Sequence, residues 1–80
     1  MNSRAKLVYA LLLVSEAFDG KVPLLRKELG EMIGISAEQV SREITKLARE
    51  GYIALIPKHN EIVIKDKPGL KEVLEVTGPR

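Results

Sequence analysis

The sequence predicts a mainly α-helical fold with a small β-hairpin, of the α+β class, and three observations support this prediction. Residues 26–33 and 37–50 repeat apolar side chains every three or four positions, as amphipathic helices do. Residues 52–65 are rich in strand-forming side chains on both sides of a polar turn, as the strands of a hairpin are. The 80 residues, 45% hydrophobic and 30% charged, suit one compact domain over residues 1–80.

A first helix is expected over residues 3–18. The segment has good helix formers and neither glycine nor proline, and Asp19-Gly20 ends it with a turn pair. Its apolar residues occupy more than one stripe, unlike those of a one-sided surface helix. Two interpretations stay open: a central helix enclosed by its own domain, or a helix whose second face meets a dimer partner or neighbouring domain.

The apolar run at residues 7–14 follows Arg4 and Lys6, which superficially resembles a secretory signal peptide. The run is too short to span a membrane. Glu16 and Asp19 follow it directly, and cleavage would leave a remnant without its first helix. We therefore expect a cytoplasmic protein that makes no membrane contact.

A short extended segment is predicted at residues 22–24, because the ring of Pro23 disfavours helical geometry at the residue before it. It would fit a brief edge strand. The second helix is expected over residues 26–33 and ends at Gly34. Its expected buried stripe consists of Leu25, Leu29, Met32 and Ile33.

A third helix is expected over residues 37–50, because Ser36 can accept a hydrogen bond from the amide of Glu38 or Gln39 and so cap its start. Gly51 ends it. The inward stripe that we predict is Val40, Ile44, Leu47 and Ala48. The predicted opposite face consists of Glu38, Ser41, Arg42, Thr45 and Arg49.

The hairpin is expected to pair residues 52–56 with residues 61–65 across a turn at 57–60. Lys67-Pro68-Gly69 should then break the chain. A short last helix would follow before a tail at residues 77–80. The residues expected to line that helix are Leu70, Val73, Leu74 and Val76.

Two short helices joined by Gly34-Ile35-Ser36 match a helix-turn-helix over about residues 26–50, and the hairpin at about 52–65 adds a wing. The fold class is therefore a winged helix-turn-helix. In this motif the second helix, here residues 37–50, lies in the major groove of DNA.

Residues 26–44 closely resemble the DNA-binding domain of the Crp/Fnr family of bacterial transcription regulators, and the resemblance continues through Leu47, residues 50–53 and residues 62–64. It implies TTGAT or TGTGA half-sites, and Ala37 looks closer to the Fnr branch. Leu25 departs from the family pattern, in which a threonine or serine caps the second helix and binds phosphate. The base-reading residues that the resemblance implies are Glu38, Ser41 and Arg42.

The chemistry of these side chains is compatible with base reading. A guanidinium can donate two hydrogen bonds to O6 and N7 of guanine, and a carboxylate can accept from N4 of the paired cytosine. The alternative for Glu38 and Arg42 is an exposed salt bridge without a function, worth about 0.2 to 0.5 kcal/mol. The residues predicted to contact the DNA backbone or flanking positions are Arg26, Lys27, Ser36, Gln39, Thr45, Lys46, Arg49, Lys58 and His59. For these, a solvated helix face or a polar turn is the simpler alternative.

The expected partner is double-stranded DNA, bound by a homodimer at an inverted repeat, with RNA polymerase as a further candidate. The family normally adds an effector-binding β-roll and a long dimerisation helix, which these residues lack, so the chain is either an excised C-terminal domain or a small factor that dimerises by another route. The main rival is a winged helix used for protein contact, which the net charge of only +2 would suit.

An enzyme is a distant alternative. The chain has no cysteine and one histidine, His59, which excludes thiol nucleophiles and multi-histidine metal sites within one chain. It also lacks a glycine-rich phosphate loop. We therefore expect no catalytic residues, no metal and no cofactor.

Overall fold

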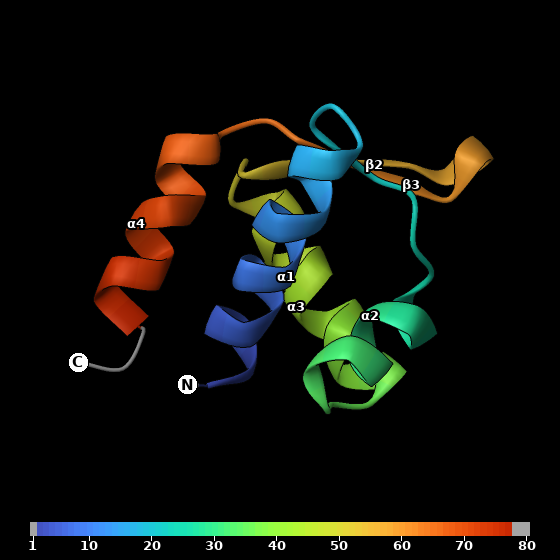
Figure 1. The fold of residues 1–80 in the computed structure, drawn as a ribbon, viewed down its shortest axis with the longest axis horizontal. Helices are drawn as coiled ribbons and strands as arrows, with labels where there is room; N and C mark the ends of the chain where they lie inside the picture. The colour runs from blue at the N-terminus through green and yellow to red at the C-terminus, as the bar shows by residue number, and fades with distance from the viewer. Residues whose placement is uncertain (1, 78–80) are drawn as a thin grey trace.

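The computed structural model describes residues 2–77, and within them a small three-stranded antiparallel sheet caps a group of four α-helices (Figure 1). This arrangement confirms the predicted fold class. The elements in chain order are α1 (Ser3–Ala17), β1 (Lys21–Val22), α2 (Arg26–Ile33), α3 (Ala37–Arg49), β2 (Ile53–Ile56), the 3-10 turn η1 (Pro57–His59), β3 (Glu61–Ile64) and α4 (Lys67–Thr77).

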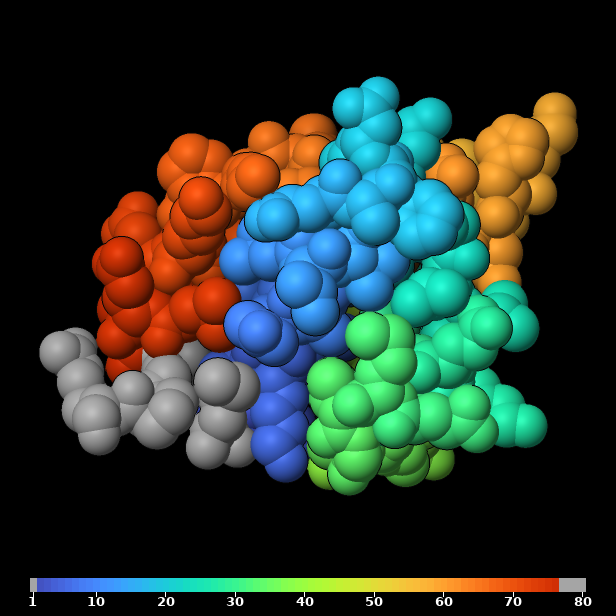
Figure 2. Space-filling model, in the orientation of Figure 1, coloured from blue at the N-terminus to red at the C-terminus, as the bar shows by residue number. Residues whose placement is uncertain are grey.

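Helix α1 lies in the middle of the fold and contacts α2, α3, α4, β1 and β3. Figures 1 and 2 show it between α4 on one side and α2 on the other. Its own domain therefore encloses most of its apolar surface, as the first of the two interpretations predicted. Tyr9 and Leu13 remain about half exposed, at 52% and 53%. The buried residues of α1 are Ala5, Leu7, Val8, Ala10, Leu11, Leu12 and Ser15.

The sheet has the order β1-β3-β2, so β3 pairs with both of the other strands. Val22 of β1 lies opposite Ile62 of β3, and both are fully buried. The predicted edge strand is therefore present, but at Lys21–Val22 rather than residues 22–24. The strand stops before Pro23, which has no amide hydrogen to donate to a neighbouring strand.

The predicted buried stripe of α2 is wrong at two positions. Leu29 is fully buried, whereas Leu25 and Met32 are each 50% exposed. Leu25 precedes the helix in an extended conformation, so helical spacing does not determine where its side chain lies. The buried residues of α2 are Leu29 and Gly30, so the buried side is centred between them. Since each residue turns the helix by about 100°, Met32 points away from that side.

Helix α4 begins earlier than predicted, because Lys67-Pro68-Gly69 forms its first turn instead of a break. The Asp66 carboxylate accepts a hydrogen bond of 3.0 Å from the amide of Gly69. Pro68 fits because first-turn amides need no partner within the helix. Leu70 and Val73 are buried as predicted, but Val76 is 78% exposed. Thr77 belongs to the helix rather than the predicted tail, whose other residues, 78–80, lie outside the described part.

None of the helices formed by residues 2–77 combines the length and apolar character that crossing a bilayer requires.

Candidate nucleic-acid interface

The start of α3 is fixed by reciprocal hydrogen bonds between Ser36 and Gln39. The amide of Gln39 donates to the Ser36 hydroxyl oxygen at 3.1 Å, and the amide of Ser36 donates to Oε1 of Gln39 at 3.3 Å. Gly34, with φ of 76°, makes the sharp turn before this cap. The predicted cap is confirmed, with Gln39 rather than Glu38 as the donor, and it determines where α3 begins.

The inward face of α3 buries Val40, Ile44 and Leu47, and Ala48 is half-buried beside them. Packing of this stripe against the core sets the rotation of the helix about its own axis. The opposite side is therefore turned to solvent. Five exposed residues, here called the polar strip, lie along that side: Glu38, Ser41, Arg42, Thr45 and Arg49.

Glu38 and Arg42 contact each other across one turn of the polar strip. An Arg42 guanidinium nitrogen donates to Oε1 of Glu38 at 3.1 Å. The Glu38 side chain is nevertheless 81% exposed and that of Arg42 is 61% exposed. An exposed pair of this kind is worth only about 0.3 to 0.5 kcal/mol. Both groups can therefore exchange this contact for an external partner at little cost.

Cationic side chains concentrate on and beside the polar strip. Arg42, Lys46 and Arg49 share one shallow hollow with Ser41 and Thr45 on the outer surface of α3. These three cations outnumber Glu38, the one carboxylate of the polar strip, so this face attracts a polyanion even though the net charge of the whole chain is only +2. The placement of the charges, rather than their sum, makes this face a candidate interface.

The wing carries a second group of predicted site residues. Lys58 and His59 are exposed in η1 at the tip of the hairpin, which stands clear of the body of the molecule (Figures 1 and 2). Arg26, at the start of α2, lines a hollow with wing residues that include Pro57 and Asn60. The fold therefore brings Arg26 to the wing, whereas Figure 1 shows the wing tip apart from α3.

The start of α2 lacks a side-chain cap from Leu25, consistent with its departure from the family pattern. The Glu28 carboxylate instead accepts from the amide of Leu25 at 2.8 Å. Lys27 is exposed in the same turn.

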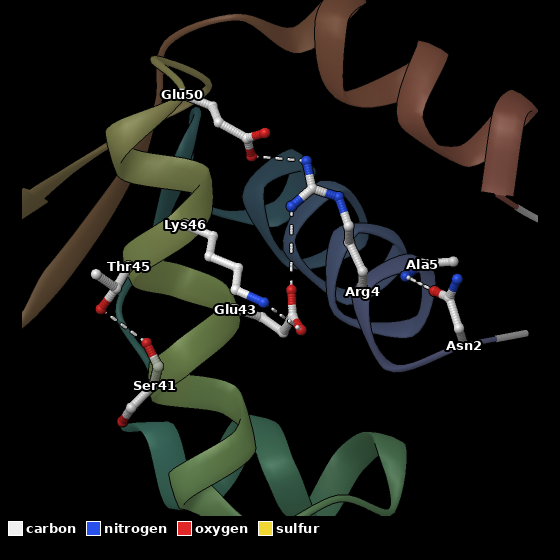
Figure 3. A network of polar contacts seen from close by, with 8 residues as sticks. All are labelled: Asn2, Arg4, Ala5, Ser41, Glu43, Thr45, Lys46 and Glu50. Atoms are coloured by element: carbon white, nitrogen blue, oxygen red, sulfur yellow. Dashed lines mark hydrogen bonds and ion pairs between the residues drawn. The ribbon is translucent and has the colours of Figure 1, made fainter.

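A polar network that no sequence pattern indicated joins α1 to α3 (Figure 3). Arg4 donates to Glu50 Oε1 at 2.7 Å, and its other terminal nitrogen lies 4.0 Å from Glu43 Oε1. Lys46 lies 4.0 Å from the second Glu43 oxygen. Glu43 Oε1 is buried without a hydrogen-bond partner, so Arg4 supplies the charge that faces it.

Replacing Arg4 by alanine should lower the free energy of unfolding by about 1 to 3 kcal/mol, because the buried Glu43 oxygen would lose the cation that faces it. Glu50→Ala removes the more exposed partner only and should cost less than about 1 kcal/mol. Urea unfolding at neutral pH measures both. If Arg4→Ala and Glu50→Ala lower the free energy of unfolding equally, the cation facing the buried Glu43 oxygen does not contribute to stability.

Among residues 2–77 there is no group of three histidine, cysteine, aspartate or glutamate side chains arranged to hold a metal ion.

Comparison with known proteins matches residues 5–73 to the family model described as the Crp-like helix-turn-helix domain. Over 42 residues, the chain is 43% identical to the transcriptional activator protein FnrL of Cereibacter sphaeroides, covering 52% of this chain and 17% of that protein.

Two solved structures from Thermus thermophilus are also similar. A transcriptional regulator of the CRP/FNR family superposes with a TM-score of 0.82 and 32% identity, covering 94% of this chain and 41% of that one. The catabolite activator protein superposes with a TM-score of 0.80 and 30% identity, covering 91% and 34%. The chain thus spans less than half the length of each of these three relatives.

Proposed function

The chain belongs to the Crp-like helix-turn-helix domain family and is therefore a DNA-binding domain of the kind found in transcription regulators, and from this premise we propose that α3 reads an operator sequence in the major groove. The observation that carries the proposal is the polar strip of α3. Its helix is capped at Ser36 and held by a buried stripe, so the exposed side chains are presented at a defined angle.

Three residues of the strip are assigned to base reading. Arg42 donates two hydrogen bonds to a guanine, and Glu38 accepts from the amino group of a cytosine. Ser41 contacts a base or a phosphate. The exposed pair of Glu38 and Arg42 supports this assignment, because the two groups already lie 3.1 Å apart and lose little when they separate.

Phosphate contacts surround the base-reading residues. Lys46 and Arg49 continue the cationic face of α3, where side chains typically meet the backbone of the duplex. The wing tip adds Lys58 and His59. Other candidates lie at the starts of the two helices. They are Arg26 and Lys27 in α2, Ser36 at the cap of α3, and Gln39 in the first turn of α3. Because Ser36 and Gln39 hydrogen-bond to each other, we expect them to contribute chiefly by fixing the start of α3.

The operator should be an inverted repeat bound by a dimer, with two copies of α3 in successive major grooves about 34 Å apart. The resemblance to the Fnr branch favours half-sites of the TTGAT kind. In a complete regulator, RNA polymerase is the further partner that we propose, and the site of action is the cytoplasm.

A second candidate function is protein contact through the outer face of α1. It is favoured by Tyr9 and Leu13, which lie one turn apart on the same side of α1 and are each about half exposed. Such a contact would not depend on the polar strip of α3.

The test is fluorescence anisotropy of labelled duplexes that carry a TTGAT-type inverted repeat or a scrambled sequence, across a series of salt concentrations. We expect tighter binding to the inverted repeat and a steep loss of affinity with salt. An enforced dimer should be measured beside the free chain, because a monomer would hold a single half-site only weakly. Equal affinity of the enforced dimer for both duplexes would refute sequence reading.

Lys46→Ala should weaken binding to both duplexes by a similar factor and reduce the magnitude of the salt slope by about 1, because one phosphate contact is lost. Lys71→Ala is the matched control: it removes one exposed lysine from α4, which lies on another side of α1. The control should leave the salt slope unchanged. An identical change in both variants would mean that total charge, rather than the face of α3, determines binding.

A further inference from the structure

Thr45 occupies the centre of the polar strip. At 100° of rotation per residue it lies between the directions of Ser41 and Arg42, one turn further along α3. It is exposed and lies in the same shallow hollow as those two residues. A helix that presents Ser41 and Arg42 to a surface therefore presents Thr45 to it as well.

The hydroxyl of Thr45 is already engaged within the helix. Its Oγ1 donates to the backbone carbonyl oxygen of Ser41 at 2.9 Å. A threonine hydroxyl has a single proton, so it has none left to donate to a phosphate, whose oxygens only accept. Figure 3 shows the hydroxyl directed along the helix to Ser41 and the methyl group directed away from it. While this bond is made, Thr45 therefore offers a partner its methyl and the accepting side of its hydroxyl oxygen, but no donor.

We propose that Thr45 recognises the C5-methyl group of a thymine by apolar contact in the major groove, an inference that rests on the proposed function of α3. Thymine is the base whose major-groove edge carries a methyl group. The hollow around Thr45 also contains Arg42, Lys46 and Arg49, whose aliphatic stems can extend the apolar surface beside the methyl.

The position of Thr45 indicates which thymine it contacts. It lies three residues beyond Arg42, or about 4.5 Å further along the helix axis. Because base pairs follow one another every 3.4 Å or so, the thymine should lie within about one or two base pairs of the guanine assigned to Arg42. Thr45 thus adds a specificity-determining contact to the three residues assigned above, in place of the phosphate contact expected from sequence.

The test replaces each thymine of the TTGAT-type duplex in turn by deoxyuridine, which lacks only the C5-methyl group. Anisotropy at low salt, on enforced dimers, compares the wild-type chain with Thr45→Ser, which keeps the hydroxyl but loses the methyl, and with Thr45→Val, which keeps a methyl and loses the hydroxyl. Thermal melting by circular dichroism verifies that both variants fold.

At one thymine per half-site, deoxyuridine should weaken wild-type binding about fourfold, the equivalent of one buried methyl-sized group. Thr45→Ser should show no penalty at that position, and Thr45→Val should retain it. If Thr45→Ser keeps every deoxyuridine penalty of the wild type while the inverted repeat is still preferred over the scrambled duplex, the Thr45 inference fails and the proposed function stands. If the enforced dimer of the wild-type chain does not prefer the inverted repeat, both fail.

Discussion

Replacing Arg42 by alanine should weaken binding to a TTGAT-type inverted repeat by about 1 to 3 kcal/mol for each half-site, a large part of the affinity that separates an operator from other DNA. The expected loss is large because a guanidinium donates two hydrogen bonds to one guanine, and alanine leaves both guanine acceptors unpaired. In the free protein, by contrast, the variant loses only one exposed ion pair with Glu38. Stability should therefore change little, and anisotropy on the two duplexes measures the effect.

Arg49→Ala is the matched control for Arg42→Ala. It removes the same side chain from the same face of α3, two turns further from the capped end. As a proposed phosphate contact, it should weaken binding to the inverted repeat and to the scrambled duplex by similar factors. If Arg42→Ala also affects both duplexes equally, Arg42 does not read a base.

Gly30→Ala should lower the free energy of unfolding by about 3 kcal/mol, the upper part of the usual range for overpacking. A methyl group at this position would lie 2.5 Å from the backbone carbonyl oxygen of Ile35, in the turn between α2 and α3. That oxygen cannot move aside without displacing the start of α3. An 80-residue domain is typically stable by about 4 to 12 kcal/mol, so the loss is a large fraction of the total.

Gly34→Asn tests the second requirement of this turn, a left-handed backbone conformation, separately from the close approach at Gly30. Gly34 adopts φ of 76° with nothing within 4 Å of an added Cβ atom, and asparagine tolerates this left-handed conformation. The variant should therefore be much less destabilised than Gly30→Ala in the same urea titration. A larger loss for Gly34→Asn than for Gly30→Ala would show that backbone conformation, rather than space, limits the turn.

The order of the helices and the orientation of α3 could be predicted because their determinants are local in sequence. The Ser36 cap, the periodic stripe of Val40, Ile44 and Leu47, and the glycine after α2 all act within a few residues of each other. The face of α3 that points to solvent follows directly from that stripe. The polar strip was therefore predictable residue by residue.

The prediction at Met32 and the missed ion pair of Arg4 depend on tertiary packing, whereas the break expected at Pro68 overlooked a local signal. Met32 matches a helical stripe, but the close approach at Gly30 rotates the buried side of α2 away from it. Pro68 suggested a break, whereas Asp66 before it caps the first turn of α4. The ion pair of Arg4 with Glu50 joins positions 46 residues apart, and no periodicity links them.

The strand order has a consequence for how the chain reaches this fold. The hairpin of β2 and β3 closes over the few residues of η1, whereas pairing of β1 with β3 closes a loop of roughly 40 residues that contains both α2 and α3. The entropic cost of closure grows with loop length, so the short hairpin forms more readily and β1 joins it later. The last ladder to form is thus the one that ties down both ends of the helix-turn-helix, and because it is only two residues long, burial of Val22 against Ile62 must contribute much of its stability.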